Sequence, residues 1–105
     1  MNAEAAQLLN KYPDRIPCIV KRSVNSSLPN IDKEKYLVPR NITMGQFMYI
    51  IRKRLKMSET VSLLLMSKMT NAMFPQEILM GQVYENHKDP DGYLYMVYTG
   101  ENTFG

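Results

Sequence analysis

The chain has 105 residues, which is enough for one domain with a single hydrophobic core. Hydrophobic residues make up 45% and charged residues 22%, as in ordinary folded proteins, and no apolar run approaches the ~18 residues of a membrane span. One cysteine excludes an internal disulfide and a cysteine-rich metal site, and a net charge of +3 is too small to indicate nucleic-acid binding.

The first residues have neither the basic start nor the apolar core of a secretory signal. We therefore expect one domain over residues 1–105, located in the cytoplasm, with no cofactor, no metal and no nucleic-acid partner. Ala3–Asn10 is rich in strong helix formers, so residues 1–11 are expected to hold an N-terminal helix. So short a helix is unstable alone and must dock on the domain.

Two strands are predicted next. The side chains of Ile16–Arg22 alternate between two faces, as in a strand that has one face in the core. Pro17 indicates that its nitrogen faces away from a ladder partner, or that the strand starts there. Lys33–Pro39 is expected to pair antiparallel with this strand, and Pro39 at its end leaves one edge available.

A helix with a strong start signal follows. Thr43 can act as its N-cap, and Gln46, three residues later, completes a capping box. Apolar residues recur at helical spacing and predict one buried stripe. The stripe contains Met44, Phe47, Met48, Ile51 and Leu55.

The last third of the chain predicts two more strands and a short helix. Val61–Met66 is expected to be a strand, Ser67–Gln76 an irregular connection and Ile78–Tyr84 a helix. Asp89–Gly92 is a dense turn signal. Tyr93–Thr99 is apolar or aromatic on both faces, which is typical of a central strand covered on each side.

This order of elements describes an α+β fold of the β-grasp, or ubiquitin-like, class. We expect a four-stranded mixed sheet, a main amphipathic helix and a short N-terminal helix. Gly100–Gly105 is expected to form an exposed, flexible tail.

The polar residues form no pattern typical of an enzyme. His87, the only histidine, lies beside the predicted turn and is expected to be solvated. Cys18 lies within the first strand and is expected to be a buried thiol. Arg52–Lys56 is expected to be a solvated helix face, because no set of stacking aromatic residues accompanies it. We therefore expect no enzymatic activity.

The glycine at the end of the chain has two interpretations. A terminal glycine lets a carboxylate enter a narrow active site, as activation to an adenylate and transfer through thioesters require. Alternatively, Gly105 is only the residue at which the sequence stops. Composition does not decide between them.

Six motifs lie in register over residues 11–105. They are Lys-Tyr-Pro-Asp-Arg-Ile-Pro at Lys11–Pro17, Asp-Lys-Glu-Lys-Tyr-Leu-Val-Pro at Asp32–Pro39, Gly-Gln-Phe at Gly45–Phe47, Ile-Arg-Lys-Arg at Ile51–Arg54, His-Lys-Asp-Pro-Asp-Gly-Tyr-Leu-Tyr at His87–Tyr95 and Gly-Glu-Asn-Thr-Phe-Gly at Gly100–Gly105. With these motifs the sequence closely resembles the autophagy ubiquitin-like modifiers, the family of GABARAP and microtubule-associated protein light chain 3.

The resemblance implies a function. Gly105 would be joined to phosphatidylethanolamine, which anchors the protein on the autophagosomal membrane, and short aromatic-x-x-aliphatic peptides of cargo receptors and adaptors would bind to it. The implied partners also include the activating and conjugating enzymes of the pathway and a processing and deconjugating cysteine protease. Before conjugation the protein would be a cytoplasmic monomer. The alternative is a soluble peptide-binding module of the same fold that is never conjugated.

The resemblance also implies a peptide site at the free edge of the second strand, where an extended peptide adds to the sheet. Its aromatic pocket would be lined by Leu8, Pro17, Ile19, Lys35, Leu37 and Tyr93. Its aliphatic pocket would be lined by Tyr36, Val38, Pro39, Ile42, Phe47, Ile50 and Ile51, of which Phe47 and Ile51 also serve the core. Acidic residues that flank such peptides would meet Lys33, Lys35 and Arg54.

Two of the departures of this sequence from the family pattern affect the implied partners. Only ten residues precede Lys11, where the family has two helices, so we expect the first of these helices to be absent and the aromatic pocket to be more open. Leu64 and Met66 stand where relatives often carry aromatic residues that help to dock the processing protease.

Overall fold

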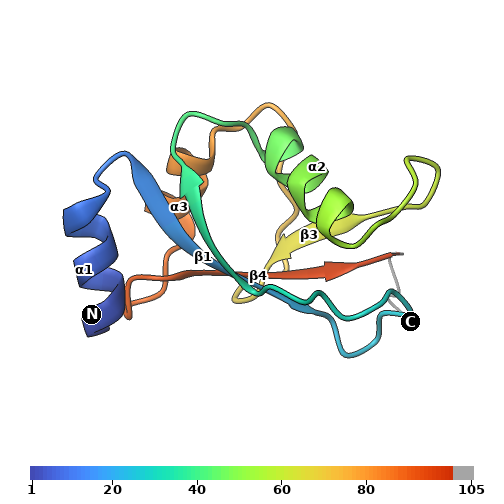
Figure 1. The fold of residues 1–105 in the computed structure, drawn as a ribbon, viewed down its shortest axis with the longest axis horizontal. Coiled ribbons are helices and arrows are strands. Elements are labelled where there is room, and N and C mark those ends of the chain that lie inside the picture. Colours follow the sequence, from blue (N-terminus) through green and yellow to red (C-terminus); the bar gives the residue numbers. More distant parts are fainter. Residues whose placement is uncertain (101–105) are drawn as a thin grey trace.

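The computed structural model describes residues 1–100, so Gly105 and the rest of the predicted tail after Gly100 lie outside the described residues. Helices and strands follow one another in the predicted order (Figure 1). They are α1 (Ala3–Lys11), β1 (Arg15–Arg22), β2 (Lys35–Pro39), α2 (Met44–Arg54), β3 (Leu64–Ser67), α3 (Met80–His87) and β4 (Leu94–Thr99).

The four strands form one mixed sheet in the order β2-β1-β4-β3. β1 pairs antiparallel with β2 and parallel with β4, and β3 pairs antiparallel with β4. The last strand is therefore central, as its apolar residues predicted, and β2 and β3 are the two edges. The prediction of a four-stranded mixed sheet in an α+β fold is confirmed.

The sheet has a main core on one face and a smaller cluster on the other. Alternate residues of β1 and β4 pack with the buried stripe of α2 in the main core. On the opposite face, α1 lies at one end of the sheet (Figure 1), where Ala5 packs with Ile19 and Tyr93. The short N-terminal helix is thus docked, as its length required.

The start signals of two helices are visible as hydrogen bonds. Thr43 Oγ1 accepts from the Gln46 backbone N–H at 3.1 Å, and Gln46 Oε1 accepts from the Thr43 N–H at 2.8 Å, which confirms the predicted capping box. Helix α1 begins after Asn2, whose Oδ1 accepts from the N–H groups of Glu4 and Ala5. This second cap was not predicted.

Some element boundaries differ from the sequence prediction. β3 begins at Leu64 rather than Val61, because the Val61 carbonyl accepts from the Arg52 side chain and its N–H donates to Ser58 in a turn. β2 begins at Lys35, two residues later than expected.

Helix α3 begins at Met80 rather than Ile78. Leu79 is extended and forms an isolated β-bridge with Thr43. The Met80 N–H donates to the Ile42 carbonyl at 2.8 Å, so this helix start is fixed by the distant segment that precedes α2.

Three single residues can be compared with their predictions. Cys18 is a buried free thiol, as expected, and burial raises its pKa. His87 is not a solvated turn residue: it ends α3 and its half-buried ring packs edge-on against Phe74, with 4.9 Å between centroids. Gly100 is not exposed but buried, and a Cβ there would lie 3.1 Å from Leu28.

Candidate functional site

The outer edge of β2 presents unpaired backbone groups. The Val20 N–H donates to Glu34 at 2.8 Å and the Arg40 N–H donates to Asp14 at 3.0 Å, so even-numbered residues of this segment bond to β1. Lys35 and Leu37 therefore direct their N–H and C=O groups away from β1. Within residues 1–100 no strand covers this edge.

The predicted aromatic pocket lies on the face of the sheet that carries α1. Pro17 and Leu37 are cross-strand partners, as are Ile19 and Lys35, so these side chains share a face. Tyr93 packs with Ile19 in the cluster under α1. Leu37 and Leu8 are half-buried and Lys35 is exposed, whereas Pro17, Ile19 and Tyr93 are buried.

A polar network connects α1 to this face. The Glu4 carboxylate accepts hydrogen bonds from the Tyr93 hydroxyl and, at 2.9 Å, from Lys35 Nζ. The ammonium group of Lys35 also lies 5.9 Å from the centroid of the Tyr93 ring. The hydrogen bond from Tyr93, together with Lys35, lowers the pKa of Glu4, while burial and the bond to Glu4 raise the pKa of Tyr93 to about 12.

The predicted aliphatic pocket lies between β2 and α2 on the opposite face. Val38, Phe47 and Ile51 belong to the buried main core. Tyr36 is half-buried, and its ring packs edge-on against Phe47 with 5.8 Å between centroids. Its hydroxyl is buried with no hydrogen-bond partner among the described residues, and burial raises its pKa to about 12.

The remaining members of the aliphatic set reach the surface. Pro39 and Ile42 are half-buried, and Ile50 is 43% exposed. Ile42 and Ile50 also line a groove of about 670 Å³ along α2. This groove is further lined by Thr43, Gly45, Gln46, Tyr49, Gln76 and Glu77.

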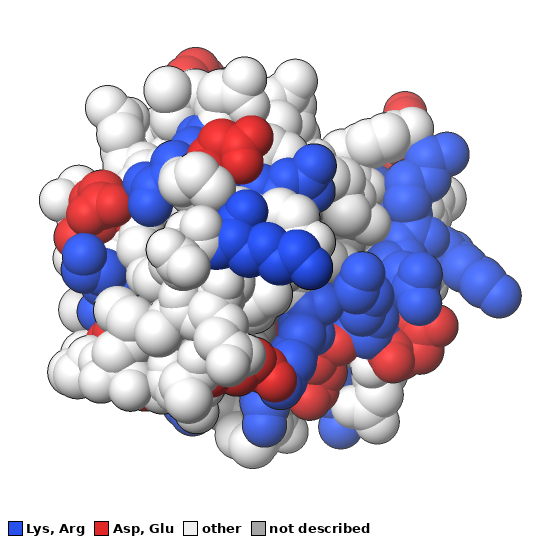
Figure 2. All heavy atoms as spheres, turned by 60° about the vertical axis from the view of Figure 1, so that its left-hand side comes forward, with Lys and Arg blue, Asp and Glu red and all other residues white. Residues whose placement is uncertain are grey.

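Basic side chains gather on one face of the molecule, where Figure 2 shows them as a band bordered by acidic side chains. The three cations predicted to meet acidic peptide residues are all exposed. Lys33 lies over the Tyr36 ring at 5.1 Å, and Arg54 Nε donates to Asp32 at 2.8 Å. Exposed pairs of this kind contribute little to stability, so these cations can exchange partners at low cost.

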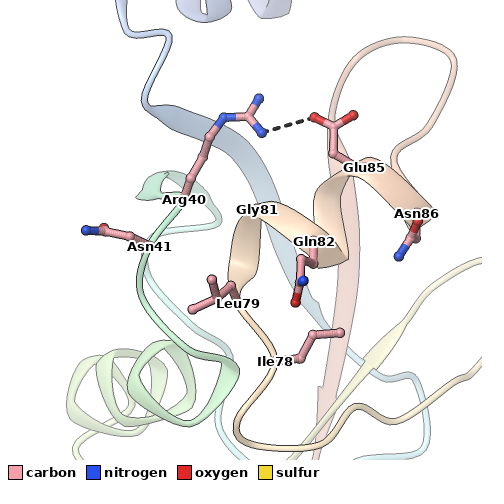
Figure 3. A pocket seen from close by; sticks show the side chains of 8 residues that line it. All are labelled: Arg40, Asn41, Ile78, Leu79, Gly81, Gln82, Glu85 and Asn86. Carbon is pink, nitrogen blue, oxygen red and sulfur yellow. Dashed lines mark hydrogen bonds and ion pairs between the residues drawn. The ribbon is translucent and has the colours of Figure 1, made fainter.

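A larger groove, of about 740 Å³, was not predicted from the sequence. It lies between the connection from β2 to α2 and helix α3 (Figure 3). An ion pair between Arg40 and Glu85, 3.0 Å long, crosses one end, and exposed Leu79 lies toward the other. The lining residues are Arg40, Asn41, Ile78, Leu79, Gly81, Gln82, Glu85 and Asn86.

Two other kinds of feature were sought in residues 1–100. This part of the chain has no group of three or more His, Cys, Asp or Glu side chains placed to hold a metal ion. None of its helices is long and apolar enough to cross a membrane.

The fold and sequence were compared with known proteins. The model of the family described as "Autophagy protein Atg8 ubiquitin like" matches residues 1–105. The chain belongs to the Atg8 family. It is thus an autophagy-related ubiquitin-like protein, and the resemblance drawn from its motifs is confirmed.

Relatives of this Atg8-family chain come from distant organisms. "Autophagy-related protein 8d" of Arabidopsis thaliana is 52% identical over 103 residues, which cover 98% of this chain and 84% of the relative. "Autophagy-related protein 8B" of Oryza sativa subsp. japonica is 50% identical over 103 residues, covering 98% and 85%. The crystal structure of Trypanosoma brucei ATG8 superposes with a TM-score of 0.88 at 37% identity, covering 98% of this chain and 87% of that one.

Sequence reasoning missed the network of Glu4, Lys35 and Tyr93. Its members are separated by 31 and 89 positions along the chain, so no local pattern indicates it. Because the pKa of Glu4 is lowered, the network stabilises the docking of α1 at pH values above the ordinary carboxyl pKa. This contribution is lost as the pH falls through the lowered value.

The network predicts the titration of one carboxyl. In Tyr93→Phe the pKa of Glu4 should rise toward its ordinary value, because the hydrogen bond that lowers it most is removed. Carbon-13 NMR of the side-chain carboxyl measures this. Asp32, whose pKa is lowered by the bond from Arg54, provides an internal control and should not change. An unchanged Glu4 would contradict the network.

Proposed function

We propose that this protein is an autophagy modifier that is conjugated through Gly105 to phosphatidylethanolamine. Once anchored on the autophagosomal membrane, it recruits cargo receptors and adaptors through aromatic-x-x-aliphatic peptides. Before conjugation it is a monomer in the cytoplasm. Membership of the Atg8 family supports the proposal, together with the motifs at Lys11–Pro17, Asp32–Pro39 and Gly100–Gly105.

One observation supports the peptide-binding part of this proposal most directly. The free edge of β2 offers the N–H and C=O groups of Lys35 and Leu37, with apolar side chains on both faces beside it. A peptide strand added there would form a further ladder with main-chain hydrogen bonds. The spacing of the motif fits this geometry.

The fit follows from the period of a β-strand. Side chains of a strand alternate between faces, so an aromatic residue and an aliphatic residue three positions later point to opposite faces. The two predicted pockets also lie on opposite faces of the sheet, one beside Leu37 and the other beside Tyr36. An added strand would therefore direct one anchor into each.

The conjugation part of the proposal depends on the chemistry of Gly105. With no side chain beside its carboxylate, a terminal glycine can enter the active sites of an activating enzyme, a conjugating enzyme and a deconjugating cysteine protease. Activation as an adenylate and transfer through thioesters would end in an amide with the phosphatidylethanolamine amine. The protein supplies the carboxylate and these partners supply the catalysis, so we propose that the chain itself is not an enzyme.

The peptide site predicts a loss of affinity in Leu37→Ala. If this side chain contacts the aromatic anchor of the peptide as a hot spot, the substitution should cost about 2 kcal/mol, or roughly 30-fold in Kd. Isothermal titration calorimetry with an acidic-flanked aromatic-x-x-aliphatic peptide measures the change. Val61→Ala removes an exposed apolar side chain outside the strands and should bind normally. Equal affinities of the two variants would refute this assignment.

The modifier role predicts lipid attachment in a reconstituted reaction. With the activating and conjugating enzymes of the pathway, ATP and phosphatidylethanolamine liposomes, the protein should gain the mass of the lipid and float with the liposomes. Gly105→Ala should do neither, because its methyl group crowds the carboxylate. If the unaltered chain stays unmodified while a control substrate reacts, the alternative holds: a soluble peptide-binding module that is not conjugated.

A further inference from the structure

A basic cavity of about 320 Å³ lies next to the predicted aromatic pocket, because Tyr95 in its lining packs against Tyr93 of that pocket with 6.2 Å between ring centroids. The cavity opens on the face of the sheet that carries α1, beyond the end that this helix covers. Lys21 is two residues after Ile19, which packs under α1, so both side chains lie on this face. Lys21 is also the partner of Val97 in the pairing of β1 with β4. The cavity is lined by Lys21, Arg22, Ser23, Val24, Lys68, Asn71, Tyr95, Met96 and Val97.

The charged side chains around this cavity are all positive. Among residues 1–100, its lining has three cations and no carboxylate. Lys21 has no ion pair or hydrogen bond through its side chain to any of residues 1–100, and Lys68 Nζ lies only over the Tyr95 ring at 5.4 Å. Asp91 is the acid that accepts from the Tyr95 hydroxyl, and it does not line the cavity.

The third cation, Arg22, follows buried Val20 at a spacing of two, so its side chain starts from the opposite face of the sheet and contributes less directly to the cavity. Arg22 Nη1 donates to the backbone carbonyls of Ser26 and Leu28, at 3.0 and 3.2 Å. Carbonyl groups orient a guanidinium but do not cancel its charge. A concave site whose cations face no carboxylate concentrates positive potential and favours an anion.

Apolar side chains beside the cavity indicate where that anion resides. Val24, which lines the cavity, is 93% exposed, and Met69, the residue after Lys68 in the sequence, is 63% exposed. Exposed aliphatic side chains beside lysines are the combination that favours the interface of an anionic membrane, where the apolar groups enter the headgroup region and the cations meet phosphates. A soluble anion would give these apolar residues nothing to contact.

The cavity is also close in sequence to the proposed attachment point. Gly105 lies eight positions after Val97 in the sequence, so at most about 28 Å of extended chain can lie between them. If Gly105 carries a phospholipid, the membrane surface lies within that reach. The choice of a lipid as ligand, but not the preference for an anion, rests on the proposed function.

We propose that this cavity binds the phosphomonoester of an anionic membrane lipid, with Lys21 and Lys68 as its principal cations. A phosphomonoester protrudes from the lipid surface, has three acceptor oxygens and carries up to two negative charges, which matches a small concave site with several donors. Binding would bring the end of the sheet that carries Lys21 and Lys68 to the membrane surface.

The test uses the unconjugated protein and vesicles of phosphatidylcholine containing either phosphatidic acid or phosphatidylserine, matched in surface potential. Co-sedimentation should show preference for phosphatidic acid. The double variant Lys21→Gln/Lys68→Gln should bind those vesicles about 30-fold more weakly. Lys53→Gln/Lys56→Gln, an equal charge change at exposed residues of the α2 end, should stay close to the unaltered protein. Amide NMR spectra check that both variants are folded.

Every other outcome overturns the proposal. Equal losses in both variants, or equal binding to the two kinds of vesicle, would mean attraction by net charge alone. Shifts of Lys21 and Lys68 on addition of glycerol 3-phosphate, without vesicle binding, would assign the cavity to a soluble phosphate. Because the assay needs neither enzymes nor Gly105, its failure is distinguishable from a failure of conjugation.

Discussion

The parallel pairing of β1 with β4 is the constraint on which the rest of the structure depends. It joins the first strand of the chain to the last, in register from Cys18 opposite Leu94 to Arg22 opposite Tyr98, and places both at the centre of the sheet. The Tyr98 hydroxyl extends this link, because it accepts from the Ile31 N–H at 2.8 Å and donates to the Pro29 carbonyl at 2.7 Å. With the centre occupied, β2 must be an edge.

An edge strand exposes backbone groups that invite pairing with another chain. Here the edge of β2 is short, and charged Lys35 lies on it beside Glu4. The proposed peptide would use the same backbone groups, and its two anchors would enter opposite faces of the sheet. The proposed lipid cavity lies over the central pair of strands rather than at this edge, on the face of the sheet that also carries the aromatic pocket.

Local patterns in the sequence predicted most of the fold. The Thr43–Gln46 capping box and the apolar β4 are short-range signals, and both were correct. The boundaries of β3 and α3 were wrong because they depend on distant partners: Arg52 bonds Val61, and Leu79 pairs with Thr43. The pocket residues came from the family resemblance, whereas the Glu4 network and the basic cavity join segments that only the folded chain brings together.

The most direct test of the account is amide hydrogen exchange along β2, measured by NMR with and without an aromatic-x-x-aliphatic peptide. The N–H groups of Lys35 and Leu37 point outward, so the peptide should slow their exchange strongly. Those of Tyr36 and Val38 already bond to β1 and should change little, which makes them internal controls. Slowed exchange confined to β3, or no change at Lys35 and Leu37 with peptide bound, would contradict strand addition at this edge.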